Sequence, residues 1–468
     1  MAKTLFQKIW DRHLVERLDG ASDLILIDRV FLHERTGSVA LRSLKQAGRS
    51  VAAPRQVFCT MDHVVDTFPG RTDKTTMPTG TNFITATREA ALEAGLTLFD
   101  LGDERQGIVH VISPEQGLVL PGASLVCPDS HTCTQGALGA LAWGIGSTEA
   151  EHALATRTLR VARPKTMRIN INGRLAAGVT AKDLALHILA RLSASGARGH
   201  AVEYAGEAVR ALSVEARLTL CNMATELSAF TALIAPDETT FEYLRGRPYA
   251  PKGEMWDQAL TEWRGLFTDP AAAFDAEHHI DAADVVPMIT WGTSPQHGVP
   301  ITGRVPRFEE VADRDSREAY DRALEYMDLL PGSELEDIRI DAAFIGSCTN
   351  SRLSDLQRAA AILKGRKVAE GVKAICVPGS TAVKRAAEAE GLDEVFKAAG
   401  FQWRESGCSM CFFAGGESFG PRSRVVTSTN RNFESRQGPE TRSHLASPET
   451  VAASAIAGRL ADPRRLFS

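Results

Sequence analysis

Three cysteines of this chain have a spacing that could bind a metal. Cys408 and Cys411 form a Cys-x-x-Cys pair, and Cys348 lies in a turn after the apolar run that ends at Ile345. Thiolates bind soft and borderline metals, and Cys-x-x-Cys lets two of them reach one ion or cluster. Taken alone, the pair also fits a redox dithiol, half of a zinc site or two unrelated thiols.

The sequence around the pair favours an iron–sulfur cluster. Zinc would need a fourth Cys or His nearby, but the sequence has no second Cys-x-x-Cys and no His at finger-like spacing. A redox motif opens a helix early in a βαβ unit, whereas this pair lies in a glycine-rich stretch. Three turn cysteines suit a cubane cluster with one iron open to substrate. The other cysteines are interpreted as buried structural thiols: Cys59, Cys127, Cys133, Cys221 and Cys376.

Acidic and imidazole side chains follow two strand-like runs in the N-terminal third. Asp62 and His63 come after the run 56–61, and Asp129, Ser130 and His131 come after the run 124–127. Polar residues at the tips of strands in an open α/β sheet often face a ligand crevice. A single Asp-His pair is more often a surface or capping pair, so these residues gain meaning only together with the cysteines.

Composition places the chain among ordinary globular proteins. It has 468 residues, 44% hydrophobic and 24% charged, with a net charge of −5. That charge gives no sign of a nucleic-acid partner. The N-terminus resembles an amphipathic helix rather than a signal peptide, and no stretch is long and apolar enough to cross a membrane. We therefore expect a cytoplasmic protein with free or metal-bound thiols.

The elements that position these residues follow an α/β pattern. From residue 338 onward, strand-like and helical stretches alternate, which predicts a mainly parallel sheet. Helices are expected over 82–94, 136–146, 181–193 and 216–230, and a strand over 107–112. The predicted domains are 1–164, 165–334 with a polar surface insertion at about 246–284, and 335–468 with the three cysteines.

These motifs, taken together and in order, resemble the aconitase superfamily over nearly the whole chain. The resemblance is carried by Met61-Asp-His63, Gly107-Ile-Val-His110, Asp129-Ser-His-Thr132, Leu220-Cys-Asn-Met-Ala-Thr-Glu226, Gly346-Ser-Cys-Thr-Asn-Ser351, Gly407-Cys-Ser-Met-Cys411 and Thr429-Asn-Arg-Asn-Phe-Glu-Ser-Arg436. It implies three α/β/α domains with mainly parallel sheets. The chain ends after its third unit, as in the branch whose swivelling fourth domain is a separate small subunit. That branch implies a heterodimer or higher assembly in which the small subunit supplies a catalytic serine.

The resemblance also implies roles for individual residues. Cys348, Cys408 and Cys411 match the ligands of one 4Fe-4S cluster that leaves one iron open, and Asn222, Asn350 and Asn430 match residues around that cluster. The residues expected to carry the chemistry are Asp62, His63, His110, Asp129, His131 and Glu226. Those expected to contact a small dicarboxylate substrate are His33, Ser130, Arg431 and Arg436.

The expected activity is that of a hydro-lyase. It would move a hydroxyl between adjacent carbons of a branched 2-hydroxy dicarboxylate, with an isopropyl-substituted malate as the first substrate and leucine synthesis as the setting. Departures beside the expected pocket, such as Pro128 and Ser435, keep methyl- and dimethyl-substituted substrates as alternatives. A non-enzymatic iron or redox sensor is a second alternative, and a zinc structural protein is a distant third.

Overall fold

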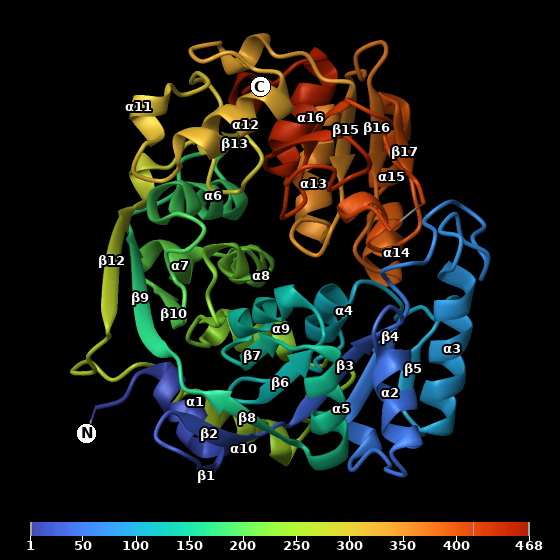
Figure 1. Ribbon diagram of the computed structural model, residues 1–468, viewed down its shortest axis with the longest axis vertical. Helices are drawn as coiled ribbons and strands as arrows, with labels where there is room; N and C mark the ends of the chain where they lie inside the picture. The colour runs from blue at the N-terminus through green and yellow to red at the C-terminus, as the bar shows by residue number, and fades with distance from the viewer. Residues whose placement is uncertain (1, 415, 467–468) are drawn as a thin grey trace.

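The computed structural model describes residues 2–414 and 416–466, and within them most strands belong to three parallel sheets. Figure 1 shows the C-terminal sheet (orange to red) above the N-terminal one (blue to teal), with the second sheet (green) beside them. The mainly parallel α/β architecture expected from the sequence is confirmed. Within the described range, no helix has the length and apolar character needed to cross a membrane.

The first sheet is parallel and has the order β5-β4-β3-β6-β7. Its strands β4 and β6 are buried at every position, as short apolar runs between two helical layers should be. The chain builds outward from β3 in one direction and then in the other, so β3 and β6 flank a topological switch point. The strands are β3 Arg29–His33, β4 Val57–Thr60, β5 Thr97–Phe99, β6 Ser124–Cys127 and β7 Leu141–Gly144.

The C-terminal sheet repeats this arrangement. Its order is β17-β16-β15-β18-β19, all parallel, so its switch point lies between β15 and β18. The turn with Cys348 leaves β15, and the turn with Asn430 leaves β18. The strands are β15 Ala342–Ile345, β16 Lys373–Cys376, β17 Phe401–Trp403, β18 Arg424–Thr427 and β19 Arg442–Leu445.

The second sheet is parallel, with the order β11-β10-β9-β12. The expectation of a surface insertion over 246–284 is wrong at its end, because β12 pairs with β9 as an edge strand. This strand buries only one of its residues, Ile280, so it lacks the apolar alternation by which strands are recognised. The strands are β9 Lys165–Asn172, β10 His200–Ala205, β11 Thr231–Leu233 and β12 Ala276–Asp281; the antiparallel pieces are β1 Leu14–Arg17, β2 Ser22–Leu26, β8 Thr158–Ala162, β13 Met288–Thr290 and β14 Gly298–Pro300.

Helices cover the sheets and begin at local signals. The Thr180 side chain accepts from the backbone of Lys182 and Asp183 to start α6, and Ser447 with Pro448 starts α16 as expected. The helices are α1 Leu5–His13, α2 Gly37–Gln46, α3 Gly80–Glu93, α4 Val109–Glu115, α5 Ser147–Thr156, α6 Ala181–Leu192, α7 Glu207–Ala211, α8 Val214–Asn222, α9 Glu238–Leu244, α10 Glu254–Trp263, α11 Phe308–Val311, α12 Arg317–Met327, α13 Leu353–Leu363, α14 Thr381–Ala389, α15 Leu392–Ala399 and α16 Pro448–Ala457, with 3-10 segments η2 Ser130–Leu138, η3 Met223–Leu227 and η6 Ser409–Cys411.

Two sequence expectations near the first sheet are wrong. Most of the run 107–112 lies in a helix instead of a strand, because α4 begins at Val109, and a short buried apolar run fits either element. The run 136–146 is not a helix but the end of η2 followed by β7. Its glycines serve close approach, since a Cβ on Gly136 would lie 1.7 Å from the Ala232 carbonyl oxygen.

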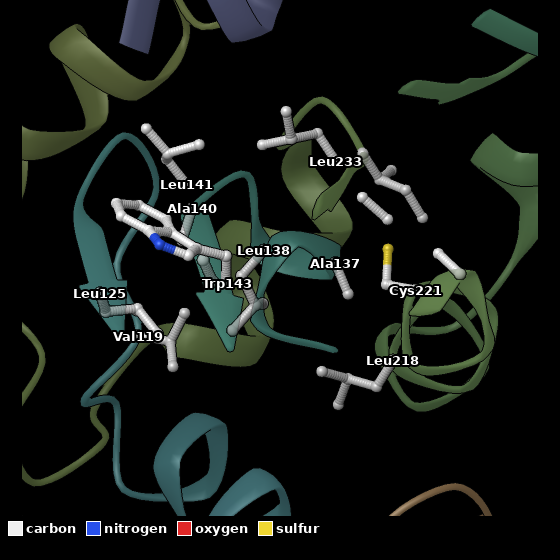
Figure 2. Packing of buried hydrophobic residues seen from close by; sticks show 14 of the residues in the cluster. Val119, Leu125, Ala137, Leu138, Ala140, Leu141, Trp143, Leu218, Cys221 and Leu233 are labelled. Carbon is white, nitrogen blue, oxygen red and sulfur yellow. The ribbon is translucent and has the colours of Figure 1, made fainter. Parts of the chain in front are cut away.

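One core joins the first two sheets. Figure 2 shows the part of it where α8 packs on η2, with Leu218 and Cys221 on one side and Ala137 and Leu138 on the other. Cys221 is fully buried there, in agreement with a structural thiol. Each of the ranges 1–164, 165–334 and 335–468 contains one parallel sheet, and the division into domains stays a prediction.

Candidate active site

The N-terminal half of the site lies at the switch point of the first sheet. His33 is the last residue of β3, and Asp129 follows β6 and caps η2 by accepting from the His131 amide at 2.8 Å. Asp62 and His63 follow β4, as the sequence predicted. The loops after three neighbouring parallel strands therefore bring these side chains together.

Two imidazoles share the Asp129 carboxylate. His63 Nε2 lies 3.1 Å from Asp129 Oδ2, and His110 Nε2 lies 2.9 Å from Asp129 Oδ1. The other ring nitrogen of His63 lies 2.5 Å from Asp62 Oδ1, while Asp62 Oδ2 accepts from the backbone amide of Val109 at the start of α4. Both ring nitrogens of His63 thus face carboxylates, which is the arrangement of a protonated imidazole.

The charges in this network favour the ionised forms. Burial lowers the pKa of His63, but Asp62 and then Asp129 outweigh burial and raise that pKa well above its ordinary value. Burial raises the pKa of Asp129, but the charge of His110 and the hydrogen bonds from His110 and His63 hold it well below its usual range. Near neutral pH the network therefore stores a proton on His63 beside ionised carboxylates.

A second pair lies beside the first. His131 Nε2 is 2.9 Å from Glu226 Oε1, and Arg431 Nε donates to the same oxygen at 2.8 Å. Glu226 is in η3, directly after α8, and Arg431 is in the turn after β18. Burial and then the charge of Arg431 lower the pKa of His131, so His131 is more easily deprotonated than His63. Ser130 is exposed, with its Oγ 3.3 Å from His131 Nδ1.

His33 lies against His63 as a stacked ring. The ring centroids are 4.0 Å apart, and His33 Nε2 approaches the carbonyl oxygen of Pro128 at 3.2 Å. Within the described residues, the buried Nδ1 of His33 has no hydrogen-bond partner. Burial and then the charge of His63 lower the pKa of His33 to about 4, so the ring is neutral and offers one nitrogen as an acceptor.

The three cysteines lie in the turns of the C-terminal sheet, buried and without disulfides. Asn222 Nδ2 and Asn430 Nδ2 lie 3.1 Å and 3.4 Å from Cys348 Sγ, and Ser347 Oγ lies 3.2 Å from Cys411 Sγ. Amide and hydroxyl donors aimed at sulfur suit thiolates bound to a metal.

Asn350 behaves differently from the other two asparagines. Its Nδ2 donates to Asp355 and to Thr219, at 3.0 Å and 3.2 Å, rather than to a sulfur. Its buried Oδ1 has no partner among the described residues. Asn350 therefore braces the turn of Cys348 against α13 in this structure.

A backbone contact joins the two halves of the site. The amide of Cys408 donates to the carbonyl oxygen of Asp62 at 2.8 Å. Arg436 lies at the rim, with its guanidinium 5.5 Å from the Phe412 ring centre, and Phe412 is 5.7 Å from the His63 ring. The cysteine turns and the carboxylate–imidazole network thus form one site between two sheets.

A family model matches residues 7–458, that of the aconitase family (aconitate hydratase). The chain belongs to the aconitase family. Membership of this family implies an iron–sulfur cluster, and the buried cysteines with sulfur-directed donors fit one. Burial and then Cys411 raise the pKa of Cys348 to about 12, so iron would displace a proton on binding.

Curated relatives in the aconitase family cover almost the entire chain. The 3-isopropylmalate dehydratase large subunit 1 of Bradyrhizobium diazoefficiens is 52% identical, over 99% of this chain and 97% of its own length. The 3-isopropylmalate dehydratase large subunit of Roseiflexus castenholzii is 50% identical, over 99% of each chain. The crystal structure of Thermococcus kodakaraensis aconitase X (holo-form) aligns with 88% of this chain and 85% of its own at a TM-score of 0.46 and 15% identity.

Sequence reasoning missed two residues that hold the site. The buried Glu34 carboxylate accepts from the amides of Asp62, His63 and Val64, at 3.0, 2.7 and 2.6 Å. Its signal was a charged residue directly after a buried strand. The buried Arg352 donates to the carbonyl oxygens of Cys348 and Thr349, each at 2.9 Å. Arg352 also reaches the His110 carbonyl oxygen at 3.3 Å, a long-range contact that has no local sequence signal.

Proposed function

We propose that this chain is the cluster-bearing large subunit of a 3-isopropylmalate dehydratase. It would interconvert 2-isopropylmalate and 3-isopropylmalate by removing water and adding it back. The observation that supports this proposal most directly is that three buried cysteines lie beside two carboxylate–imidazole networks. The two groups of residues meet where the Cys408 amide contacts the Asp62 carbonyl oxygen. The names of the two relatives supply the substrate, and leucine synthesis in the cytoplasm is the proposed setting.

The proposed cofactor is one 4Fe-4S cluster held by Cys348, Cys408 and Cys411. When bound, it supplies a Lewis acid at its open iron for the substrate hydroxyl and an adjacent carboxylate. We propose that Asn222 and Asn430 orient the sulfurs through their amide groups. Asn350, whose Nδ2 is used elsewhere, would act by holding the Cys348 turn.

The chain's own residues would handle the protons. Hydroxide is a poor leaving group, so dehydration needs an acid, and His63 is the imidazole that two carboxylates keep protonated. Asp62 holds the His63 ring through Nδ1, and Asp129 links it to His110. The His131 and Glu226 pair would orient substrate and water on the other side of the pocket.

Substrate carboxylates would be held by guanidinium groups and a hydroxyl donor. Arg431 uses Nε for Glu226, which leaves its two terminal nitrogens for a carboxylate. The Nε of Arg436 has no partner among the described residues, and the side chain is half-buried at the rim. Ser130, exposed beside His131, would add a hydroxyl donor to these contacts. His33, stacked on His63, would contact the substrate through its acceptor Nδ1, which suits a substrate hydroxyl.

The proposed partner is a small subunit. Both relatives are named as large subunits, which points to a second chain. We propose that this chain supplies the swivel domain and a catalytic serine, in a heterodimer or higher assembly. Support comes from exposed aromatic rings next to Arg436 at the rim of the site. Phe433 is 48% exposed with its ring centre 5.2 Å from the Arg436 guanidinium, and Phe413 is 36% exposed with its amide donating to the Arg436 carbonyl oxygen.

A substrate panel tests the proposal. The chain would be reconstituted anaerobically with iron and sulfide, combined with the small subunit, and given 2-isopropylmalate, 2-methylmalate, citraconate and dimethylmaleate. We expect kcat/KM to be highest for 2-isopropylmalate, by roughly 10- to 200-fold, the discrimination that an apolar contact with an extra methylene supplies. Preference for citraconate or dimethylmaleate would assign the chain to another hydro-lyase, and no turnover of any of them would favour a sensor.

A further inference from the structure

A lysine lies fully buried behind the cysteine turns. Lys182 is the second residue of α6, with 0% of its surface exposed, and its Nζ donates to the carbonyl oxygens of Ser428, at 2.9 Å, and Thr429. Lysines are almost never fully buried unless their charge is paired. A cation in the first turn of a helix is also disfavoured by the helix dipole. This position therefore calls for a nearby negative charge.

The carboxylates near Lys182 are occupied elsewhere. Asp183 accepts from Thr180 and from the amide of Met288. Asp355 accepts from Asn350, from Arg358 and from the amide of Arg352. The hydrogen bonds described for the ammonium group go to neutral carbonyl oxygens.

The two carbonyl groups that bind Lys182 belong to the turn that faces the cysteines. Asn430, the next residue, points its amide at Cys348 Sγ. Ser428 Oγ lies 3.1 Å and 3.2 Å from the carbonyl oxygens of Gly346 and Asn350 and shares its one proton between them, so it spans the Cys348 turn. Lys182 therefore supports the meeting point of the turns after β15 and β18.

The charges around Lys182 also point to the cysteines. Burial lowers the pKa of Lys182 to about 7, and the charges that oppose this most are the thiolates of Cys411 and then Cys348, ahead of Asp183 and Asp355. Thiolates on an iron–sulfur core leave the assembly with net negative charge in a buried place. Reduction potentials of such clusters depend on the net charge around them and on solvent exposure.

We propose that Lys182 is the buried counter-charge of the iron–sulfur cluster. Its ammonium group stabilises the added electron of the reduced cluster and slows the loss of iron, without contacting the substrate. The proposal rests on the cluster half of the proposed function and is independent of which acid is the substrate.

The test uses the whole chain reconstituted anaerobically with iron and sulfide, without substrate or partner. Lys182→Met removes the charge at similar length, and Lys182→Gln removes it while keeping a donor. We expect both to move the midpoint potential to more negative values and to release iron to a chelator several-fold faster. The control is Lys8→Met, which removes a charge on α1 that pairs with Asp269. It should leave the midpoint potential and the rate of iron release unchanged.

The outcomes separate this inference from the proposed function. A wild-type chain that takes up no cluster contradicts both. A loaded wild type with an unchanged potential in either Lys182 variant overturns the counter-charge alone, even where melting temperatures fall. If neither neutral variant holds iron, Lys182→Arg tests the counter-charge instead, because it keeps the positive charge. Retained iron with a midpoint potential close to that of the wild type supports the counter-charge, and loss of iron overturns it.

Discussion

Replacing Cys348 with serine should leave the reconstituted chain without the visible absorption of its cluster and without dehydratase turnover. Cys348 is the cysteine on which the Asn222 and Asn430 amides converge. Losing it removes one of the three proposed thiolate ligands and, with it, the Lewis acid that the cluster would supply. Because a bound Lewis acid contributes several kcal/mol, we expect turnover to fall by about a thousandfold or more. Absorption spectra, iron content and turnover with the small subunit measure the effect.

The matched control is Cys376→Ala. Cys376 is also fully buried in the C-terminal sheet, on β16, and lies in its apolar core. Removing its sulfur should cost about 1 kcal/mol of stability, as the loss of a small buried group does, and leave colour and turnover intact. Turnover that persists in Cys348→Ser would contradict the cluster assignment.

The second large effect is expected for Asp129→Asn. This carboxylate accepts from His63 and from His110 with separate oxygens, and an amide can accept with only one of them. Its NH₂ group would face a ring nitrogen that now donates. We expect kcat/KM for 2-isopropylmalate to fall by about 10²- to 10⁴-fold, the range that a positioned acid contributes.

The same substitution should change the pH profile in a defined direction. Asp129 is one of two carboxylates that raise the pKa of His63, so its loss lowers that pKa. The imidazolium then gives up its proton at lower pH, and the alkaline limb of kcat/KM moves to lower pH. Asp315→Asn is the control, because Asp315 also pairs with a histidine, His297, at 3.0 Å, but lies outside the site. An unmoved alkaline limb in Asp129→Asn would reject His63 as the acid.

Local sequence signals predicted much of the scaffold. The strand ends that place Asp62 and Asp129 are short apolar runs followed at once by polar residues, and such runs are recognisable without neighbours. Ser447 and Pro448 predicted the start of α16 for the same reason, because an N-cap serine before a proline is a local signal. Family resemblance supplied the roles of the site residues, and the structure brings Asp62, Asp129 and the cysteines together.

Features that depend on distant contacts could not be predicted from local patterns. The start of α4 is an apolar run whose helical form is favoured by the bond from the Val109 amide to Asp62, made across the loops of the first sheet. The position of Glu34 after a buried strand hinted at a role, but the contacts of Glu34 and Lys182 could not be predicted, because each acts on backbone groups of a turn far along the chain. Ser435 adopts a left-handed φ of 63°, a conformation that its own residue type does not announce.

The most direct test of the central claim is the metal content of the anaerobically reconstituted wild-type chain, with spectra taken before and after adding 2-isopropylmalate. Three cysteine ligands and one open site predict iron and sulfide in the equal amounts of a 4Fe-4S cluster, and one iron whose spectrum changes when the substrate is added. A colourless chain after careful reconstitution, or zinc as its bound metal, would contradict the claim.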